Sequence, residues 1–234
     1  MFSLWEIISP LRKIKSEKKY RWFDNLLLIF LGNFSLRLLF PLGLAFFVRS
    51  EGEDSFYHLV FSILLLDLLI YIQHVLSHKV DFLWRFHKIH HSDLDMDVTT
   101  ALRFHPIEIV LSFFYKAFFI YVFCISIEAI FLFEIILSSM ALFNHSNIKL
   151  PKKLDRFFQY VFVTPVFHTV HHSQVSAQMN SNYGFNLSIW DRIFKTYKEV
   201  HYKAIHIGLI EFSQNGQLLI LKLLKFPFER GQKR

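Results

Sequence analysis

Long apolar stretches are the feature of this sequence that most restricts what it can fold into. Four of them stand out, at about 25–48, 56–76, 107–125 and 128–144, and the last two are nearly continuous. A helix needs about 20 predominantly apolar residues to cross the hydrocarbon core of a bilayer. We therefore predict about four transmembrane helices, with the last two forming a tight helical hairpin.

The composition agrees with this prediction. Of 234 residues, 53% are hydrophobic, and Phe alone occurs 29 times, with a mean hydropathy of +0.33. That is too apolar for an ordinary soluble domain. The length suits a single domain, residues 1–234, of the all-α integral membrane class. Because the first stretch contains Arg37 and Pro41, it could form two half-depth helices in place of one straight span.

The distribution of charge predicts the orientation in the membrane. Six Lys and Arg residues precede the first stretch, whereas Glu51, Glu53 and Asp54 dominate the loop after it. Further Lys and Arg residues follow the second and fourth stretches. Cytosolic loops carry the excess of basic residues, so the N-terminus and two polar segments, 77–106 and 145–204, should lie in the cytosol. These segments would form a helical cap.

The excess of basic residues over acidic residues does not indicate a nucleic-acid partner. The net charge of +7 comes from residues that flank apolar stretches, where they set topology and contact anionic lipid headgroups. The tail, 218–228, mixes Leu and Ile with Lys222 and Lys225, which predicts a helix at the membrane interface. The single Cys124 excludes an intrachain disulfide, a Cys-ligated zinc site and an iron–sulfur cluster.

Histidine is unusually frequent, with 13 residues, and eight of these fall into three boxes. The boxes are His74 and His78; His87, His90 and His91; and His168, His171 and His172. On a helix, residues three or four positions apart share a face. Each box should therefore direct its imidazoles into one small volume. Neutral imidazoles converging at one end of a helical bundle suit a pair of borderline transition metals.

The kind of metal site is narrowed by motifs that the sequence lacks. There is no H-E-x-x-H motif of zinc proteases, and no Glu-x-x-His motif of carboxylate-bridged di-iron bundles. A membrane cytochrome would place its axial histidines within the spans and not at their ends. A histidine-rich dinuclear site remains, and iron suits oxygen chemistry there, although a purified protein could carry zinc.

The sequence resembles the fatty acid hydroxylase superfamily, also called sterol desaturase-like, and within it the short bacterial-type members. The resemblance covers roughly residues 58–200 and rests on the three boxes in order. Three further segments carry it: HSDLDMDVTTALRFHPIE (91–108), FNHSN (143–147) and NYGFNLSIWDRIFKTY (182–197). Lys195 departs from the family, which usually has Gly there, and this puts the local loop geometry in question.

The resemblance implies a membrane-bound, O2-dependent oxidoreductase with two iron ions. It would hydroxylate or desaturate a fatty acyl, sterol-like or ether lipid, using electrons from an external electron-transfer protein. It also implies a multi-pass protein of a bacterial inner membrane with its active site facing the cytosol. Relatives carry a ligand-like histidine after the fourth span, so we predict His145 as a further metal ligand, the alternative being a capping or interfacial histidine.

Two other residues are candidates for the surroundings of the metals. Asp67 shares a helix face with His74 and His78, so it could orient a ligand imidazole; the alternative is an ion pair with Arg37 or Lys116. His105 could be a further ligand, but Pro106 after it indicates a turn that enters the third span.

The remaining polar residues near the boxes receive structural predictions. We expect Asp93, Asp95 and Asp97 mainly on a solvated loop and Glu108 paired with Arg103. Asn182, Tyr183 and Gly184 could line the pocket, and Trp190, Asp191 and Arg192 should clamp the chain after the third box. His58, at the far end of the second span, should be too distant to join the cluster, and His201 and His206 should lie on the surface.

Two rival functions use the same histidines. One is a zinc-dependent membrane hydrolase with a metal-bound hydroxide, and the other is a metal-ion transport or binding protein. The location of the histidines argues against transport, because they gather at one face and no file of polar residues crosses the bilayer.

Overall fold

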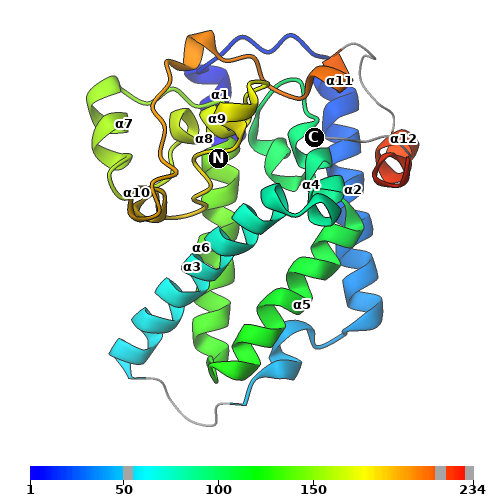
Figure 1. The fold of residues 1–234 in the computed structure, drawn as a ribbon, viewed down its shortest axis with the longest axis vertical. Coiled ribbons are helices and arrows are strands. Elements are labelled where there is room, and N and C mark those ends of the chain that lie inside the picture. The colour runs from blue at the N-terminus through cyan, green and yellow to red at the C-terminus, as the bar shows by residue number, and fades with distance from the viewer. Residues whose placement is uncertain (50–54, 214–219, 230–234) are drawn as a thin grey trace.

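The structure is a computed structural model that describes residues 1–49, 55–213 and 220–229. Four long helices form a bundle, and shorter helices gather over one of its ends as a cap (Figure 1). The long helices are α2 (Lys18–Leu39), α3 (Phe56–Lys79), α5 (Pro106–Val122) and α6 (Ile127–His145). Between the described residues the sheet contacts are isolated bridges alone, so the predicted all-α class is confirmed.

Three segments are long and apolar enough to cross a membrane: α2 with the following 3-10 helix η1 (Gly43–Phe47), α3, and α6. Helix α5, with 17 residues, packs against α2 and α3 within the same bundle. Multiple membrane-spanning helices make the chain an integral membrane protein. Helices α3, α5 and α6 begin and end within about three residues of their predicted bounds.

The first span differs from its prediction. Helix α2 continues through Arg37 and ends at Leu39, where the Phe40 amide closes the last turn on the Leu36 carbonyl. It is therefore one helix and not two half-depth pieces, because Pro41 lies beyond its end. It also begins at Lys18, seven residues earlier than expected, since its first turns carry polar residues that are buried in the cap.

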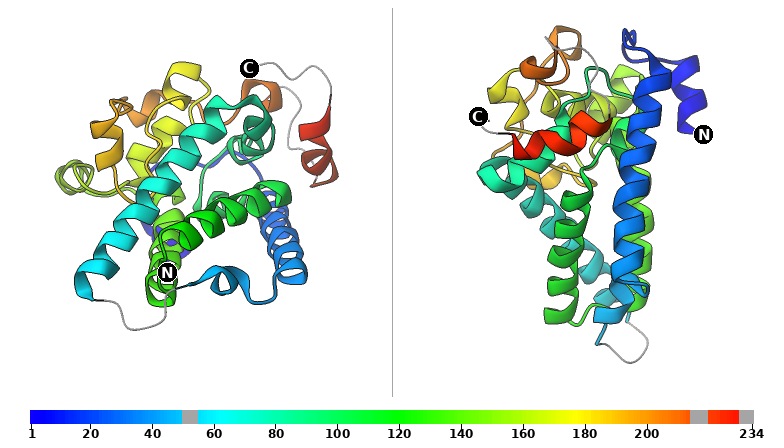
Figure 2. Two further views of the ribbon diagram at one scale, coloured as in Figure 1. Left: turned by 60° about the horizontal axis from the view of Figure 1, so that its bottom comes forward. Right: turned by 90° about the vertical axis from the view of Figure 1, so that its right-hand side faces the viewer.

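The cap is built from short helices and loops that gather over one end of the bundle. Its helices are α1 (Phe2–Ile8), α4 (Asp81–His91), η2 (Val98–Leu102), α7 (Lys152–Phe158), α8 (Pro165–His171), α9 (Ser176–Met179), α10 (Ile189–Ile193), η3 (Tyr202–Ala204) and α11 (Ile210–Ser213). Helix α12 (Ile220–Lys225) contacts α2, and η4 (Phe226–Phe228) after it contacts α4, on the outside of the cap (Figure 2). The interfacial location of the tail stays a prediction, and its residues 218 and 219 lie outside the described residues.

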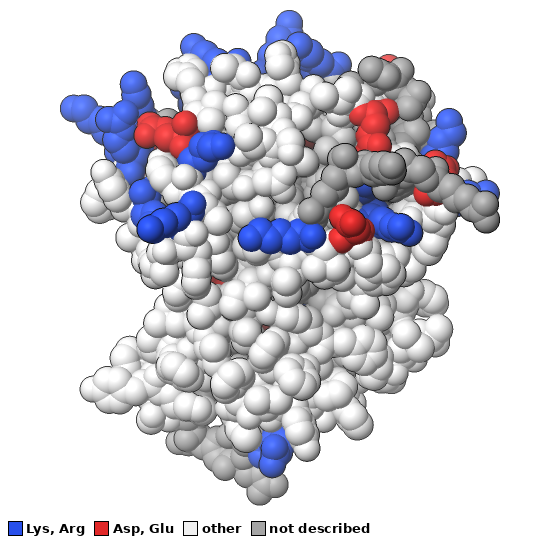
Figure 3. Space-filling view, viewed as in Figure 1, with Lys and Arg blue, Asp and Glu red and all other residues white. Residues whose placement is uncertain are grey.

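The bundle has apolar residues on both its inner and outer faces. Leu66, Ile120 and Phe133 belong to a buried cluster between α3, α5 and α6, whereas Phe30 and Phe131 are exposed. An exposed apolar surface of this kind is the one expected to meet lipid. Lys and Arg gather mostly over the cap, and the long helices are nearly free of charge on this face (Figure 3). The acidic loop used for the orientation lies outside the described residues.

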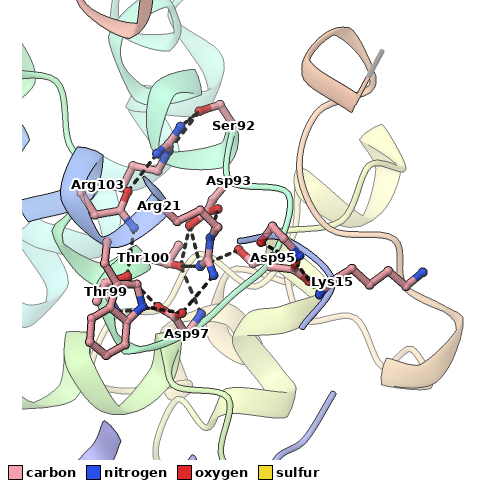
Figure 4. Close-up of polar contacts among 12 residues, drawn as sticks. Lys15, Arg21, Ser92, Asp93, Asp95, Asp97, Thr99, Thr100 and Arg103 are labelled. Carbon is pink, nitrogen blue, oxygen red and sulfur yellow. Dashed lines mark hydrogen bonds and ion pairs between the residues drawn. The ribbon is translucent and has the colours of Figure 1, made fainter. Parts of the chain in front are cut away.

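Arg21 joins the first helix to the loop after the second histidine box (Figure 4). Its guanidinium contacts Asp93 at 2.7 Å and Asp97 at 3.0 Å, and all three side chains are buried. Burial raises the pKa of Asp93, but the guanidiniums of Arg21 and Arg103 outweigh burial and hold it below its usual value. The prediction of a solvated loop is therefore wrong for Asp93 and Asp97.

The predicted pair between Arg103 and Glu108 is also absent. The Arg103 guanidinium donates to the Ile89 carbonyl, to the Ser92 hydroxyl and to Asn25. It thereby fixes the end of α4 to α2, while Glu108 faces a histidine instead.

Replacing Arg21 should test how much this network stabilises the fold. We expect Arg21→Met to lower the free energy of unfolding by about 3–5 kcal/mol, because it leaves two buried carboxylates without a cation. Combining it with Asp93→Asn and Asp97→Asn should recover part of the loss. Denaturant titration in detergent micelles measures both. A change of less than about 0.5 kcal/mol, as at an ordinary surface position, would contradict the assignment.

Candidate metal centre

The cap brings the ends of α3, α4, α6 and α8 together, and each of these ends carries histidines. All nine histidines predicted as ligands are buried there, and they separate into two groups. Group A consists of His74, His78, His87, His91 and His171. Group B consists of His90, His145, His168 and His172. No carboxylate belongs to either group among the described residues.

The spacing within each box explains this division. His87 and His91 are four residues apart on α4, share a face and both join group A, whereas His90 points to group B. In the third box, His168 and His172 are four residues apart and both join group B, whereas His171 joins group A. Each H-x-x-H-H box therefore contributes to both groups and holds them side by side.

The two groups are in direct contact. The ring centroids of His91 and His172 lie 4.5 Å apart, and those of His171 and His168 lie 5.2 Å apart. Within each group the ligand nitrogens all lie within 4.8 Å of one another. Opposite ligands of one ion, at about 2.1 Å each, would be about 4.2 Å apart. The geometry therefore suits one ion in each group.

Several imidazoles have their orientation fixed from outside. The Nδ1 atoms of His74, His145 and His171 lie 2.7 to 2.9 Å from the carbonyl oxygens of Tyr183, Ala141 and Ser181, respectively. A carbonyl oxygen can only accept, so each Nδ1 carries the proton and donates it. The lone pair then lies on Nε2, which faces the centre, as in known metal sites.

Unpaired ring nitrogens test whether a metal fits. His78, His91 and His172 are buried, and neither ring nitrogen of any of them has a hydrogen-bond partner. In group B the Nε2 atoms of His90 and His168 each lie 3.0 Å from the Nε2 of His145. Buried polar atoms of this kind are costly without a partner, and a shared cation would satisfy them. These are two buried histidine clusters able to bind metal ions.

Five of the clustered histidines favour the neutral form at pH 7. Burial, reinforced by the neighbouring imidazoles, lowers the pKa values of His90, His91, His168, His171 and His172 well below 6.5. A metal ligand must be deprotonated, so little proton release opposes metal binding here.

Glu108 is a contributor that the sequence analysis missed. Its Oε1 lies 2.6 Å from the Nδ1 of His87, an arrangement that orients a ligand and increases its basicity. The two residues are 21 positions apart, so no local spacing could reveal the contact. His105, in contrast, caps α5 by accepting from the Ile107 amide and belongs to neither group.

Asp67 has a different partner from either one predicted. Its Oδ2 accepts from the indole nitrogen of Trp190 at 2.7 Å, whereas Lys116 pairs with Glu134 and Arg37 donates to the Pro41 carbonyl. Asp67 therefore anchors the Trp190 segment to α3 and touches no ligand imidazole in the structure.

The segment after the third box acts as the predicted clamp. Asp191 accepts from the amides of Tyr183 and Gly184, so it fixes the loop whose carbonyl holds His74. Its burial raises its pKa to about 6. A side chain at Gly184 would meet the Leu187 carbonyl. Lys195 has a φ of 58°, a conformation that favours the glycine usual at this position.

The histidines predicted to lie outside the cluster do so. His201 and His206 are exposed, as predicted, and His58 belongs to neither group.

A cavity of about 1100 Å³ reaches the metal centre from the membrane side. Its walls come from α2, α3, α5 and α6, and they include His74 and His87 of group A as well as Glu108. Apolar atoms dominate the lining, and the cavity extends to Phe131 and Ile127 at the far end of α6. The metal centre is therefore open to an apolar ligand from within the bundle.

Removing one ligand should test the division into groups. We expect wild-type protein to bind two Co2+ or Zn2+ ions per chain, and His145→Asn to retain only the ion of group A. The control His105→Asn should retain both, because His105 caps a helix. Elemental analysis after dialysis measures the ratio. Two tightly bound ions in His145→Asn would contradict a separate group B.

Acid should destabilise the metal-free protein. An unfolded histidine takes up a proton below about pH 6.5, whereas the buried histidines stay neutral, so stability falls as the pH drops through that value. Each such histidine contributes up to about 1.4 kcal/mol per pH unit. Asp191, whose pKa is raised in the folded protein, changes the stability in the opposite direction, but it is one group against several histidines. Unfolding midpoints between about pH 7.5 and about pH 5.5 measure the effect, and His201→Gln should not change it. A flat profile would contradict neutral burial.

Comparison with known proteins agrees with this site. The fatty acid hydroxylase family matches residues 59–196. The ornithine lipid hydroxylase OlsE of Rhizobium tropici is 30% identical over 142 residues, covering 60% of this chain and 42% of that protein. Alkylglycerol monooxygenase of Homo sapiens is 27% identical over 138 residues, covering 57% and 29%, respectively.

Cholesterol 25-hydroxylase of Mus musculus is 27% identical over 172 residues, covering 69% of this chain and 56% of the relative. The chain thus spans about half or less of the length of these relatives. No solved structure matches it. The family match covers more than half of the chain and contains all nine clustered histidines, which confirms the family predicted from the boxes. The chain belongs to the fatty acid hydroxylase family.

Proposed function

We propose that the chain is a membrane-bound, non-haem di-iron oxygenase that hydroxylates a lipid with O2 and electrons from an external donor. One observation carries this proposal: two adjacent groups of buried histidines lie beside an apolar cavity within the membrane bundle, and His74 and His87 of group A line that cavity. An all-nitrogen donor set suits iron as well as zinc, and the cavity suits a lipid better than a water-soluble substrate.

The family relatives support iron and hydroxylation. By their names, those compared above are hydroxylases or a monooxygenase acting on an ornithine lipid, an alkylglycerol or cholesterol. These different lipids have an apolar portion in common. We therefore propose an amphipathic lipid as the substrate class, with hydroxylation favoured over desaturation.

The residues of the chain have separable tasks in this reaction. The nine histidines would hold the two irons, which supply oxygen activation for oxidation of a C–H bond. The carbonyls of Tyr183, Ala141 and Ser181 keep the Nδ1 protons of their histidines in place, so that each Nε2 remains a donor. The apolar cavity wall positions the lipid beside His74 and His87 and excludes water from group A.

The proposed orientation has the cap in the cytosol. Lys and Arg gather mostly over the cap (Figure 3), as the rule for cytosolic loops requires. An electron-transfer protein would then reach the metals from the cytosol without crossing the membrane. An acidic surface on that protein would complement the basic cap.

Isotopically labelled O2 provides a test of the proposal. We expect deletion of the gene from its natural host to remove a lipid that is one oxygen atom heavier than its precursor. Wild-type protein and His201→Ala should restore it, with the added atom coming from labelled O2, and His171→Ala should not. Mass spectrometry of the lipids measures this. Oxygen from water, with zinc retained after an iron-replete preparation, would favour the hydrolase.

A further inference from the structure

An ion pair lies in the wall of the cavity, away from the metal centre. The Lys116 ammonium of α5 lies 2.5 Å from Oε1 of Glu134 on α6, and both residues line the cavity. The two helices separate from their connecting turn toward the cap (Figures 1 and 2). The pair therefore forms a bar between them, and the Glu134 side chain is 37% exposed.

Cavity-lining residues lie on both sides of this bar. Toward the histidines, α6 contributes Leu137, Ser138 and Ala141. On the far side, Phe131 and the η1 residue Ala45 line the wall. We call the part of the cavity beside the metals the near chamber and the part beyond the bar the far chamber.

The helical rise gives the length of the near chamber. Lys116 lies eight residues from Glu108 on α5, and Glu134 lies eleven residues from His145 on α6. At about 1.5 Å per residue, the bar is about 12–16 Å from the metal centre along the helices. An extended lipid chain that reacts at the metals would meet the bar at that depth.

An apolar chain has no favourable way past the bar. Charged groups at this depth in a membrane protein are costly and are usually kept paired. A chain that separated Lys116 from Glu134 would leave each charge without its partner, and methylene groups offer no hydrogen bond in exchange. A chain that ends before the bar leaves the pair intact.

We propose that the Lys116–Glu134 pair closes the near chamber and limits the length of the lipid chain that the site accepts. This inference rests on the proposed function, because it takes the cavity as the lipid site. The two residues are specificity-determining, and neither touches the metal ligands in the structure.

Matched substitutions on the two sides of the bar test the proposal. The probe is displacement of the fluorescent lipid cis-parinaric acid by saturated fatty acids from decanoic to eicosanoic acid, on purified protein in nanodiscs. We expect Ser138→Phe, in the near chamber, to weaken binding of the longest accepted acid about tenfold, the scale of a small change in pocket size. Ala45→Phe, in the far chamber, should leave the length profile unchanged.

Two double variants test the bar itself. Lys116→Leu with Glu134→Leu should extend the profile to longer acids, whereas the exchanged pair, Lys116→Glu with Glu134→Lys, should keep the wild-type limit. Thermal unfolding establishes that each variant is folded.

Three outcomes would overturn the length limit alone. If Ala45→Phe shortens the profile, chains pass the bar. If the leucine pair leaves the limit where it was, the bar does not set it, and if the exchanged pair loses binding altogether, the charges recognise a polar group of the ligand. In each of these cases the lipid site itself stands. If wild-type protein binds no probe at all, the proposed lipid cavity fails, and the length limit fails with it.

Discussion

The burial of nine imidazoles in one volume is the constraint on which the rest of the structure depends. His78, His91 and His172 have no hydrogen-bond partner for either ring nitrogen, and buried polar atoms without partners are expensive. Protonation would not relieve this cost, because like charges would crowd together in a desolvated site. Cations held between the rings would relieve it, so folding of the cap and metal binding should stabilise each other.

The polar residues around the histidines follow from the same constraint. Arg21 and Arg103 tie α2 to the end of α4 through Asp93, Ser92 and Asn25, and Asp191 ties the clamp to the loop that holds His74. These contacts hold rigid elements at distances that a metal requires, which loops alone would not maintain. Lys195 fits this view: its left-handed backbone costs about 1–2 kcal/mol, and hydrogen bonds from Thr196 to Asp191 fix the turn despite that cost.

The sequence alone predicted what depends on periodicity and short spacing. The all-α class, the approximate bounds of α3, α5 and α6 and the meeting of the eight box histidines follow from apolar runs and from the three boxes, whereas His145 was predicted from the family resemblance. Contacts between distant segments were not accessible in this way. Glu108 was assigned to Arg103 because the two are close in sequence, yet it contacts His87. Asp67 lies on the predicted helix face, but its partner, Trp190, is 123 residues away. Asp93 and Asp97 appeared solvated because Arg21, 72 and 76 residues earlier, could not be placed beside them.

The clustered histidines lie within the part of the chain that the family model matches, whereas the cavity wall uses residues both inside and outside that part. All nine clustered histidines fall within residues 59–196. Much of the cavity wall does so too, but Ile29, Asn33 and Leu36 of α2 line it from outside that range. A metal site tolerates little variation, because every ligand must keep its distance and tautomer, whereas a cavity wall can change shape one side chain at a time. The relatives are named for an ornithine lipid, an alkylglycerol or cholesterol. Under the proposed function, the choice of lipid by this chain should therefore be sought in the residues that line its cavity, those of α2 included.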